Sequence, residues 1–441
     1  VTISDIREAE ALQAEMEALN LPVTYVLGEH PFTLLDGCDL LCLSGGVPTD
    51  LPVIEEARRR GIPLSNDAQE FMKRCPAPVL GITGSAGKTT TTSLVGEMVR
   101  EAGYTRWVGG NIGNPLLNDL GKIGESDQIV MELSSFQLEL MDVSPHVAGV
   151  LNITPNHLDR HGTMKAYIEA KANIVTHQSA SDIAVLGYDD SNARALAERT
   201  PAQVRYFSDK QTVTAGSFLD GEMLMLCRAG SCKPVCQRGE IPLRGAHNVL
   251  NVLAAITLAD AINVPVAAMR RAIRQFTGVE HRLEEVRRWH DALWINDSIA
   301  TAPERVLAAL DSFDEPLMLL AGGRDKDLPW EDFARRVVQR VRVLILFGEA
   351  ADLIDGHVCR IWEGVGRLGA LQEIVRGETL ARAVDAAAQR VQVGDVVLLS
   401  PGGTSFDAYR DFAERGEHFR ALVNVLGTDD MEKTANEAQE A

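Results

Sequence analysis

The sequence predicts an α/β protein of three domains, and three observations support this fold class. The chain has 441 residues, more than one hydrophobic core usually serves, so several domains are expected. Short apolar runs alternate with helical stretches in three successive series, the pattern of parallel sheets covered by helices. In the second series a glycine-rich segment with a lysine joins a strand to a helix. We therefore expect Rossmann-like first and third domains around a central domain with the parallel sheet of phosphate-loop ATPases.

The first domain is expected at residues 1–74. Residues 2–5 have the pattern of a strand end, and a helical stretch follows from Ile6 to Leu19. Apolar runs and one helical stretch then alternate in the order 23–27, 40–43, 51–60 and 62–64. A dinucleotide-type fold normally opens with a strand and a glycine-rich turn before these elements, so we expect both to precede Val1.

The second domain is expected at residues 75–278, because the prolines of Cys75-Pro-Ala-Pro78 interrupt the pattern before the glycine-rich segment. Strands are predicted at 128–133, 147–153 and 182–186, each followed by a helix. Residues 204–243 predict an additional β-rich segment with glycine turns, and helices return at 247–276.

The third domain is expected at residues 279–428, after Thr277-Gly278. Its strands are predicted at 292–296, 317–321, 343–347 and 395–400, separated by helices. Residues 429–441 are acidic and poor in apolar side chains, which predicts a disordered tail.

The composition argues against two classes of partner. The net charge of −19 and the pI near 5.0 argue against a nucleic-acid surface, which needs clustered basic residues. No apolar run of membrane-spanning length occurs, and the first thirty residues lack the pattern of a signal peptide. We expect a cytoplasmic monomer that binds neither nucleic acid nor membranes.

The seven cysteines are few and odd in number, so reduced thiols are expected in place of a disulfide framework. Cys227, Cys232 and Cys236 lie close enough in sequence to raise the alternative of a zinc site. No fourth ligand follows at the spacing of a zinc finger, and the surrounding residues predict hairpin strands.

The segment from Gly81 to Thr92 has the features of a phosphate-binding loop. Its glycines allow backbone N–H groups to point at phosphate oxygens, Lys88 neutralises charge, and Thr89 can hold Mg²⁺. Ile82 stands where the general pattern has glycine, and the alternative is an ordinary glycine-rich turn with a surface lysine. The residues expected to bind ATP here are Gly84, Ser85, Gly87, Lys88, Thr89 and Thr90.

Two further polar residues follow strands of the same predicted sheet. Glu132 ends an apolar strand and is a candidate Mg²⁺ ligand, because the carboxyl ends of parallel strands gather beside the phosphate loop. His157 follows the next strand and could ligate a second cation through a neutral imidazole. For each residue the alternative is structural: a solvated acid for Glu132, and a cap or core histidine for His157.

Three segments together resemble the Mur ligase family: the loop T-G-S-A-G-K-T at 83–89, M-E-L-S-S-F-Q-L at 131–138 and N-I-T-P-N-H-L-D-R-H at 152–161. The resemblance covers nearly the whole chain and implies an ATP- and Mg²⁺-dependent ligase of peptidoglycan precursor synthesis. It also implies a carbamoylated lysine at Lys171. The catalytic residues carried over are Lys88, Glu132, His157 and Lys171, and the metal ligands are Thr89, Glu132, His157 and Lys171.

The resemblance also implies binding residues for the substrates. Those near the sugar nucleotide are Ser44, Asn111, Ser134 and Gln137, and those near ATP include Asn248, Asn251, Arg282 and Asp297. Asp297 would accept the ribose hydroxyls, since a carboxylate can accept two donors. Third-domain residues resemble a D-glutamate pocket of the family, namely Thr301, Lys326, Ser405, Phe406 and Phe412.

One departure affects the amino-acid site. Where the family commonly has D-S-K-A-T, this chain has Asp297-Ser-Ile299-Ala-Thr301, so an expected lysine is replaced by an apolar residue. Loss of a charge-assisted hydrogen bond ordinarily costs about 1.5–3 kcal/mol. Either another basic group such as Arg324 compensates, or glutamate is held differently.

The implied reaction activates the carboxylate of UDP-N-acetylmuramoyl-L-alanine as an acyl phosphate and joins it to the amine of D-glutamate, giving ADP and phosphate. Alternatives remain open: another Mur ligase, a folylpolyglutamate synthetase with a different acceptor, a non-catalytic ATP-binding protein, or a phosphate-loop kinase.

Overall fold

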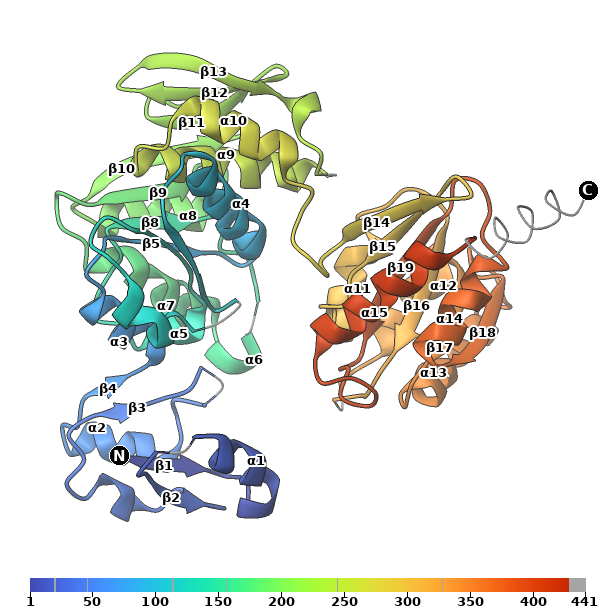
Figure 1. Ribbon diagram of the computed structural model, residues 1–441, viewed down its shortest axis with the longest axis horizontal. Coiled ribbons are helices and arrows are strands. Elements are labelled where there is room, and N and C mark those ends of the chain that lie inside the picture. The colour runs from blue at the N-terminus through green and yellow to red at the C-terminus, as the bar shows by residue number, and fades with distance from the viewer. Residues whose placement is uncertain are drawn as a thin grey trace, which may run out of the picture. The chain divides into compact units, whose positions relative to one another are not determined.

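The computed structural model describes residues 1–19, 21–45, 47–112, 115–156, 158–243, 245–326 and 328–427. The chain divides into two compact units, one comprising Val1–Pro242 and Ala246–Phe276 and the other Leu243–Gly245 with the chain from Thr277 onward. Both units are α/β, which confirms the predicted fold class (Figure 1). The predicted tail at 429–441 lies outside the described residues.

The first unit opens with short strands and helices. These are β1 (Thr2–Asp5), α1 (Ala9–Leu19), β2 (Thr24–Leu27), the 3₁₀ helix η1 (Phe32–Leu35), β3 (Leu41–Cys42), α2 (Pro52–Arg59), β4 (Leu64–Ser65) and α3 (Asp67–Arg74). The strands are parallel, as predicted, but they form two two-stranded sheets, β1–β2 and β3–β4, in place of the single sheet expected. Because β3 and β4 have two residues each, their ladder is too short to extend across the domain.

A nine-stranded sheet forms the rest of the first unit, in the order β13-β12-β11-β10-β9-β8-β5-β7-β6. Its strands are β5 (Val79–Thr83), β6 (Arg106–Gly110), β7 (Gln128–Glu132), β8 (Val147–Val150), β9 (Ile183–Gly187), β10 (Gln203–Ser208), β11 (Gly216–Asp220), β12 (Met223–Arg228) and β13 (Ser231–Gln237). In the spatial order from β11 to β6, which includes β5, neighbouring strands pair in parallel. β12 pairs antiparallel with both β11 and β13. The predicted β-rich segment therefore extends the central sheet and ends it at β13.

Helices cover this sheet because its central strands are apolar on both faces. On one face, α3, α5 and α7 share a buried cluster that includes Phe71, Leu138 and Ile174, while α4 and α9 pack against each other and against strands of the sheet. The helices are α4 (Lys88–Glu101), η2 (Leu116–Lys122), α5 (Ser135–Glu139), α6 (Leu158–His161), α7 (Met164–Thr176), α8 (Ser191–Ala195), η3 (Leu196–Arg199), η4 (Arg238–Glu240), α9 (Ala246–Ala261) and α10 (Val266–Gln275).

The second unit contains a six-stranded sheet in the order β14-β15-β19-β16-β17-β18, parallel except for β14. Its strands are β14 (Glu284–Trp289), β15 (Ala292–Asn296), β16 (Leu317–Gly322), β17 (Val341–Phe347), β18 (Glu373–Glu378) and β19 (Val396–Gly402). Its helices are α11 (Pro303–Leu310), α12 (Glu331–Arg340), α13 (Ala351–Gly364), α14 (Leu380–Ala388) and α15 (Phe412–Val425).

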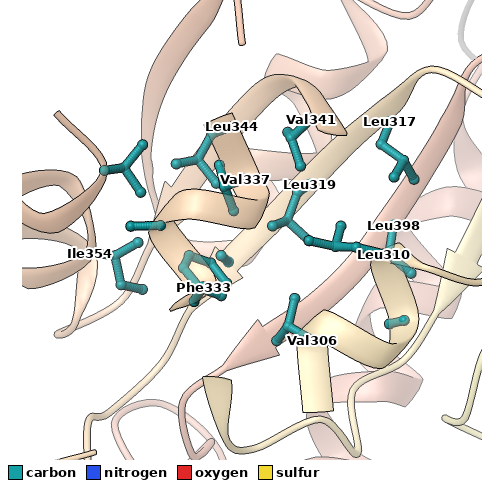
Figure 2. Close-up of a cluster of buried hydrophobic side chains, with 14 of the residues drawn as sticks. Val306, Leu310, Leu317, Leu319, Phe333, Val337, Val341, Leu344, Ile354 and Leu398 are labelled. Carbon is teal, nitrogen blue, oxygen red and sulfur yellow. The ribbon is translucent and has the colours of Figure 1, made fainter. Parts of the chain in front are cut away.

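Alternate residues of each strand in this sheet enter different cores. Leu319 and Leu398 join a cluster with residues of α11, α12 and α13, shown in Figure 2. Leu320 and Leu399, their neighbours along the strands, join a second cluster with α14 and α15. Helices on both faces explain why β15, β16 and β19 are buried along their whole length.

The structure differs from the prediction of reduced cysteines at one pair of residues. Cys227 and Cys232 face each other across the β12–β13 hairpin, with Cα atoms 4.0 Å apart, and form a disulfide. The expectation of reduced thiols is therefore wrong for this pair, because hairpin pairing brings the two residues directly opposite each other. Cys236 is a buried free thiol, so the three cysteines do not form a zinc ligand set.

Among the described helices, none is both long enough and apolar enough to cross a membrane.

Candidate functional site

The glycine-rich loop lies between β5 and α4, at the carboxyl end of a central strand. Gly84 to Gly87 form the turn, and α4 begins at Lys88. Gly87 has φ 83°, and a Cβ atom there would overlap the side-chain oxygen of Asn251. Glycine is therefore required at this position, both for the left-handed backbone and for the close approach of α9.

Hydrogen bonds from the segment after β8 hold the loop in place. The backbone N–H of Ser85 donates to the carbonyl of Asn152 at 2.9 Å, and the N–H of Ala86 donates to Asn152 Oδ1 at 2.9 Å. Ser85 Oγ also donates to the carbonyl of Thr154 at 2.9 Å. The ammonium of Lys88 lies over the loop, 2.9 Å from the carbonyl oxygen of Gly84. A helix N-terminus and a lysine at one rigid loop make a suitable site for a polyphosphate.

Glu132 and Thr89 meet beside this loop, as the sequence predicts. Thr89 Oγ1 donates to Glu132 Oε2 at 2.8 Å, and Asn111 Nδ2 donates to Glu132 Oε1 at 2.8 Å. Glu132 is only 2% exposed. A hydroxyl and a carboxylate are the oxygen ligands that Mg²⁺ prefers, and two such oxygens in contact can occupy adjacent positions of one coordination sphere. The residues present therefore fit a magnesium ion.

Lys171 reaches the same loop from α7. Its side chain is buried, and its ammonium donates to Thr83 Oγ1 at 3.2 Å and to the Gly84 carbonyl at 3.0 Å. It also lies 4.8 Å from the centre of the Tyr167 ring. Burial and then the positive charge of Lys88 lower the pKa of Lys171 well below its usual value, although the charge of Glu132 opposes this shift.

The other residues of the first unit that are predicted to bind ATP lie on helices α4 and α9. Asn251 is buried on α9 against the loop, and its amide donates to Asn248 Oδ1 at 2.9 Å. Thr90 lies in the first turn of α4 and is half-buried. His157 lies outside the described residues, so its proposed role as a metal ligand stays a prediction.

The residues predicted to bind the sugar nucleotide lie in different parts of the first unit. Ser44 lines a small pocket of the first unit together with Asn66, Phe136 and Arg160. Ser134 and Gln137 instead form the capping box of α5: Gln137 N–H donates to Ser134 Oγ at 3.2 Å, and Ser134 N–H donates to Gln137 Oε1 at 3.1 Å. Both residues therefore have a local structural role, and their contact with a substrate stays a prediction.

In the second unit, the candidate residues gather at the carboxyl ends of three neighbouring parallel strands. Asp297 and Thr301 follow β15, Ser405 follows β19, and Lys326 follows β16. Two backbone hydrogen bonds between Arg324 and Thr404, of 2.9 and 2.8 Å, join the last two loops. This edge is where open α/β sheets bind ligands.

Three other candidates flank this edge. Ser405 is 2% exposed, whereas its neighbour Phe406 is 61% exposed. Phe412 begins α15, and its carbonyl accepts from Ser298 Oγ at 2.7 Å. Arg282 is half-buried in the turn before β14, and its charge acts on Asp297.

Asp297 is buried beneath the loops of this edge. Its carboxylate accepts from Ser400 Oγ at 2.7 Å and from the N–H of Leu283 at 3.3 Å. Burial raises the pKa of Asp297 to about 7, despite these hydrogen bonds and the positive charges of Arg282 and Arg305. These contacts occupy carboxylate oxygens that the ribose was expected to use, and the ribose role stays a prediction.

We predict that replacement of Asp297 by asparagine removes a pH dependence of stability. A raised pKa means that the folded chain retains a proton that the unfolded chain releases between about pH 4 and pH 7, so stability falls as pH rises through that window. Relative to Asp297→Asn, the wild type should lose roughly 2–4 kcal/mol between pH 5 and pH 8. Urea unfolding of both proteins across this range measures the difference, with the exposed Asp314→Asn as control. The same slope in all three proteins would contradict the prediction.

Two residues that the sequence analysis missed complete the first site. Asn152 holds the phosphate loop, and the hydroxyl of Tyr167 lies 3.0 Å from Ser85 Oγ. Asn152 opens the segment that was singled out for His157, and Tyr167 precedes Lys171 by four residues, which places both on one face of α7.

Comparison with protein families matches two parts of the chain. Residues 82–259 match the Mur ligase middle domain, and residues 281–403 match the Mur ligase glutamate ligase domain. The matched ranges include the phosphate loop, Glu132 and Lys171 in the first unit and Asp297 and Lys326 in the second.

Curated relatives are similar over nearly the full length. A UDP-N-acetylmuramoylalanine--D-glutamate ligase of Symbiobacterium thermophilum is 44% identical over 97% of this chain and 93% of its own length. A protein of the same name from Acetivibrio thermocellus is 38% identical over 97% of this chain and 91% of its own.

Solved structures share the fold at low sequence identity. A UDP-N-acetylmuramate-alanine ligase from Thermotoga maritima has a TM-score of 0.57 at 21% identity, covering 96% of this chain and 93% of its own. A MurF ligase from Thermotoga maritima in complex with ADP has a TM-score of 0.55 at 17% identity, with coverage of 96% and 93%.

Proposed function

The chain belongs to the Mur ligase family, and from this premise we propose that it joins D-glutamate to UDP-N-acetylmuramoyl-L-alanine at the expense of ATP. The carboxylate of the alanyl group attacks the γ-phosphorus of ATP, ADP leaves, and an acyl phosphate forms. The amine of D-glutamate then attacks the acyl carbon, and phosphate leaves with formation of the amide. The observation that carries this proposal is the similarity to D-glutamate ligases along 97% of the chain.

Groups of the first unit are suited to the phosphoryl transfer. Lys88 and the N-terminus of α4 place positive charge at one loop, which stabilises charge on transferring phosphate oxygens. Thr89 and Glu132 would hold Mg²⁺, with His157 and Lys171 as the further ligands that we propose. The ion would neutralise charge on the phosphates.

We propose that Lys171 carries a carbamate. An ammonium at this position would repel both Lys88 and a metal ion, whereas a carbamate presents two anionic oxygens. Its formation needs only carbon dioxide: the neutral amine nitrogen attacks the carbon, and one proton leaves to solvent. The burial of the side chain and its lowered pKa support this assignment, because the neutral amine is the form that reacts with carbon dioxide.

The second unit is proposed to bind D-glutamate through Thr301, Lys326, Ser405, Phe406 and Phe412, which lie around one sheet edge. For the sugar nucleotide we propose Ser44, Asn111, Ser134 and Gln137. ATP contacts are proposed for Asn248, Asn251, Arg282 and Asp297. We propose that the protein acts as a monomer in the cytoplasm.

A coupled assay for phosphate release tests the function. Release should require ATP, UDP-N-acetylmuramoyl-L-alanine and D-glutamate together, and L-glutamate should not replace the D isomer. Chiral analysis of the hydrolysed product identifies the added residue. Turnover with folate and glutamate, or ATP binding without turnover on any acceptor, would overturn the proposal.

A further inference from the structure

The amino-acid site has to compensate more negative charge than its one predicted lysine can neutralise. When glutamate attacks as a neutral amine, its two carboxylates carry two negative charges. Lys326 can compensate one of them, and the lysine that the family commonly has at position 299 is Ile299 in this chain. An isoleucine side chain offers neither a charge nor a hydrogen bond.

Arg324, the basic residue first considered as a replacement, is already paired. Its guanidinium donates two hydrogen bonds to the carboxylate of Glu349, from Nε at 2.8 Å and from Nη2 at 3.0 Å. This fork geometry is the strong form of an arginine–carboxylate pair. To bind a substrate carboxylate, Arg324 would first have to leave Glu349.

Arg305 lies beside the loop that carries Ile299 in place of the lysine. The segment from Asp297 to Ala302 connects β15 to α11, and Arg305 is in the first turn of that helix. Its Nη1 atom lies 3.4 Å from the carbonyl oxygen of Ile299, so the guanidinium folds back over the residue that replaces the lysine. Arg305, six residues further along the chain, therefore places a positive charge beside the loop that lacks the lysine.

Arg305 and Lys326 lie close enough for their charges to interact. Partial burial and then the positive charge of Arg305 lower the pKa of Lys326. Arg305 is exposed, and across the described ranges no carboxylate forms an ion pair with either residue. Two cations that repel each other at the carboxyl edge of a parallel sheet form a site for a dianion.

We propose that Arg305 is a specificity-determining residue that binds one carboxylate of the glutamate substrate while Lys326 binds the other. This assignment rests on the function proposed above. In this chain the arginine on α11 takes over the contact made elsewhere in the family by the lysine at position 299. A planar guanidinium can bind a carboxylate through two parallel hydrogen bonds, which a lysine cannot do.

Steady-state kinetics of Arg305→Ala test the assignment. The KM for D-glutamate should rise about 10- to 100-fold, the range expected for loss of a charge-assisted contact, while the KM values for ATP and the sugar nucleotide stay unchanged. Arg360→Ala, which removes an exposed arginine from another helix of the same unit, should behave as wild type. Because Arg305 is exposed, both variants are expected to fold, and thermal unfolding checks this.

Restoring the lysine provides the decisive comparison. In the Arg305→Ala background, Ile299→Lys should recover at least tenfold of the lost affinity for D-glutamate. An unchanged KM in Arg305→Ala, equal rises for all three substrates, or no recovery in the double variant would overturn the assignment. If the wild type itself showed no turnover dependent on D-glutamate, the proposed function would fail and the assignment of Arg305 with it, whereas D-glutamate turnover that is insensitive to Arg305→Ala would overturn the assignment alone.

Discussion

Replacement of Lys88 by alanine is expected to lower the rate of phosphate release by about 10³-fold or more. Lys88 begins α4, and its ammonium lies 2.9 Å from the carbonyl oxygen of Gly84 in the phosphate loop. A cation fixed there stabilises the charge that develops on phosphate oxygens in the transition state. Alanine removes that charge but keeps the high helix propensity needed at the start of α4.

The coupled assay at saturating substrates measures this loss. Lys122→Ala is a suitable control, because Lys122 is an exposed residue that forms a surface ion pair with nearby Asp119. Thermal unfolding should show that the Lys88 variant remains folded. If Lys88→Ala retained more than about a tenth of wild-type turnover while folded, the loop would not be the site of phosphoryl transfer.

Replacement of Lys171 by glutamine is expected to reduce turnover by about 10²-fold or more. Glutamine keeps much of the volume of the buried side chain but cannot form a carbamate. A short carboxylate such as acetate should restore part of the activity of the smaller variant Lys171→Ala, because it can occupy the space left by the side chain. Rescue of this kind distinguishes loss of an anionic group from simple loss of packing.

Carbon-13-labelled bicarbonate gives a readout that does not depend on turnover. The wild-type protein should show a carbamate signal by NMR, and Lys171→Gln should not. Lys165→Ala, on an exposed position of the same helix, should keep both the signal and the activity. Full activity in Lys171→Gln, or the same spectrum in both proteins, would contradict the carbamate assignment.

The sequence was most informative where local pattern and tertiary structure agree. The apolar run before the phosphate loop becomes the fully buried strand β5, and the threonine-rich segment after it becomes α4, which is largely buried. Agreement was poorer at the N-terminal end: the apolar runs predicted at 40–43 and 62–64 coincide with β3 and β4, but these strands pair with each other and not with β1 and β2. The Cys227–Cys232 pair depends on hairpin register, which sequence spacing alone does not determine.

For the site, motif residues at strand ends could be predicted, as shown by the contact between Thr89 and Glu132. Residues whose hydrogen-bond partners are distant in sequence could not be predicted. Asn152 holds a loop 66 residues away in sequence, and the side chain of Asp297 is bonded by Ser400 from another strand. Arg305 was missed because its importance depends on which other basic groups already have partners.

The edge strand β13 also affects how the chain behaves among its own copies. An unpaired strand edge can recruit another chain through its free N–H and C=O groups, which is the first step of edge-to-edge aggregation. Pro234 in this strand has no N–H to offer, its neighbour Lys233 is exposed and charged, and the ladder shifts register between Leu224 and Met225. These features discourage the addition of a strand from another copy at this edge of the nine-stranded sheet.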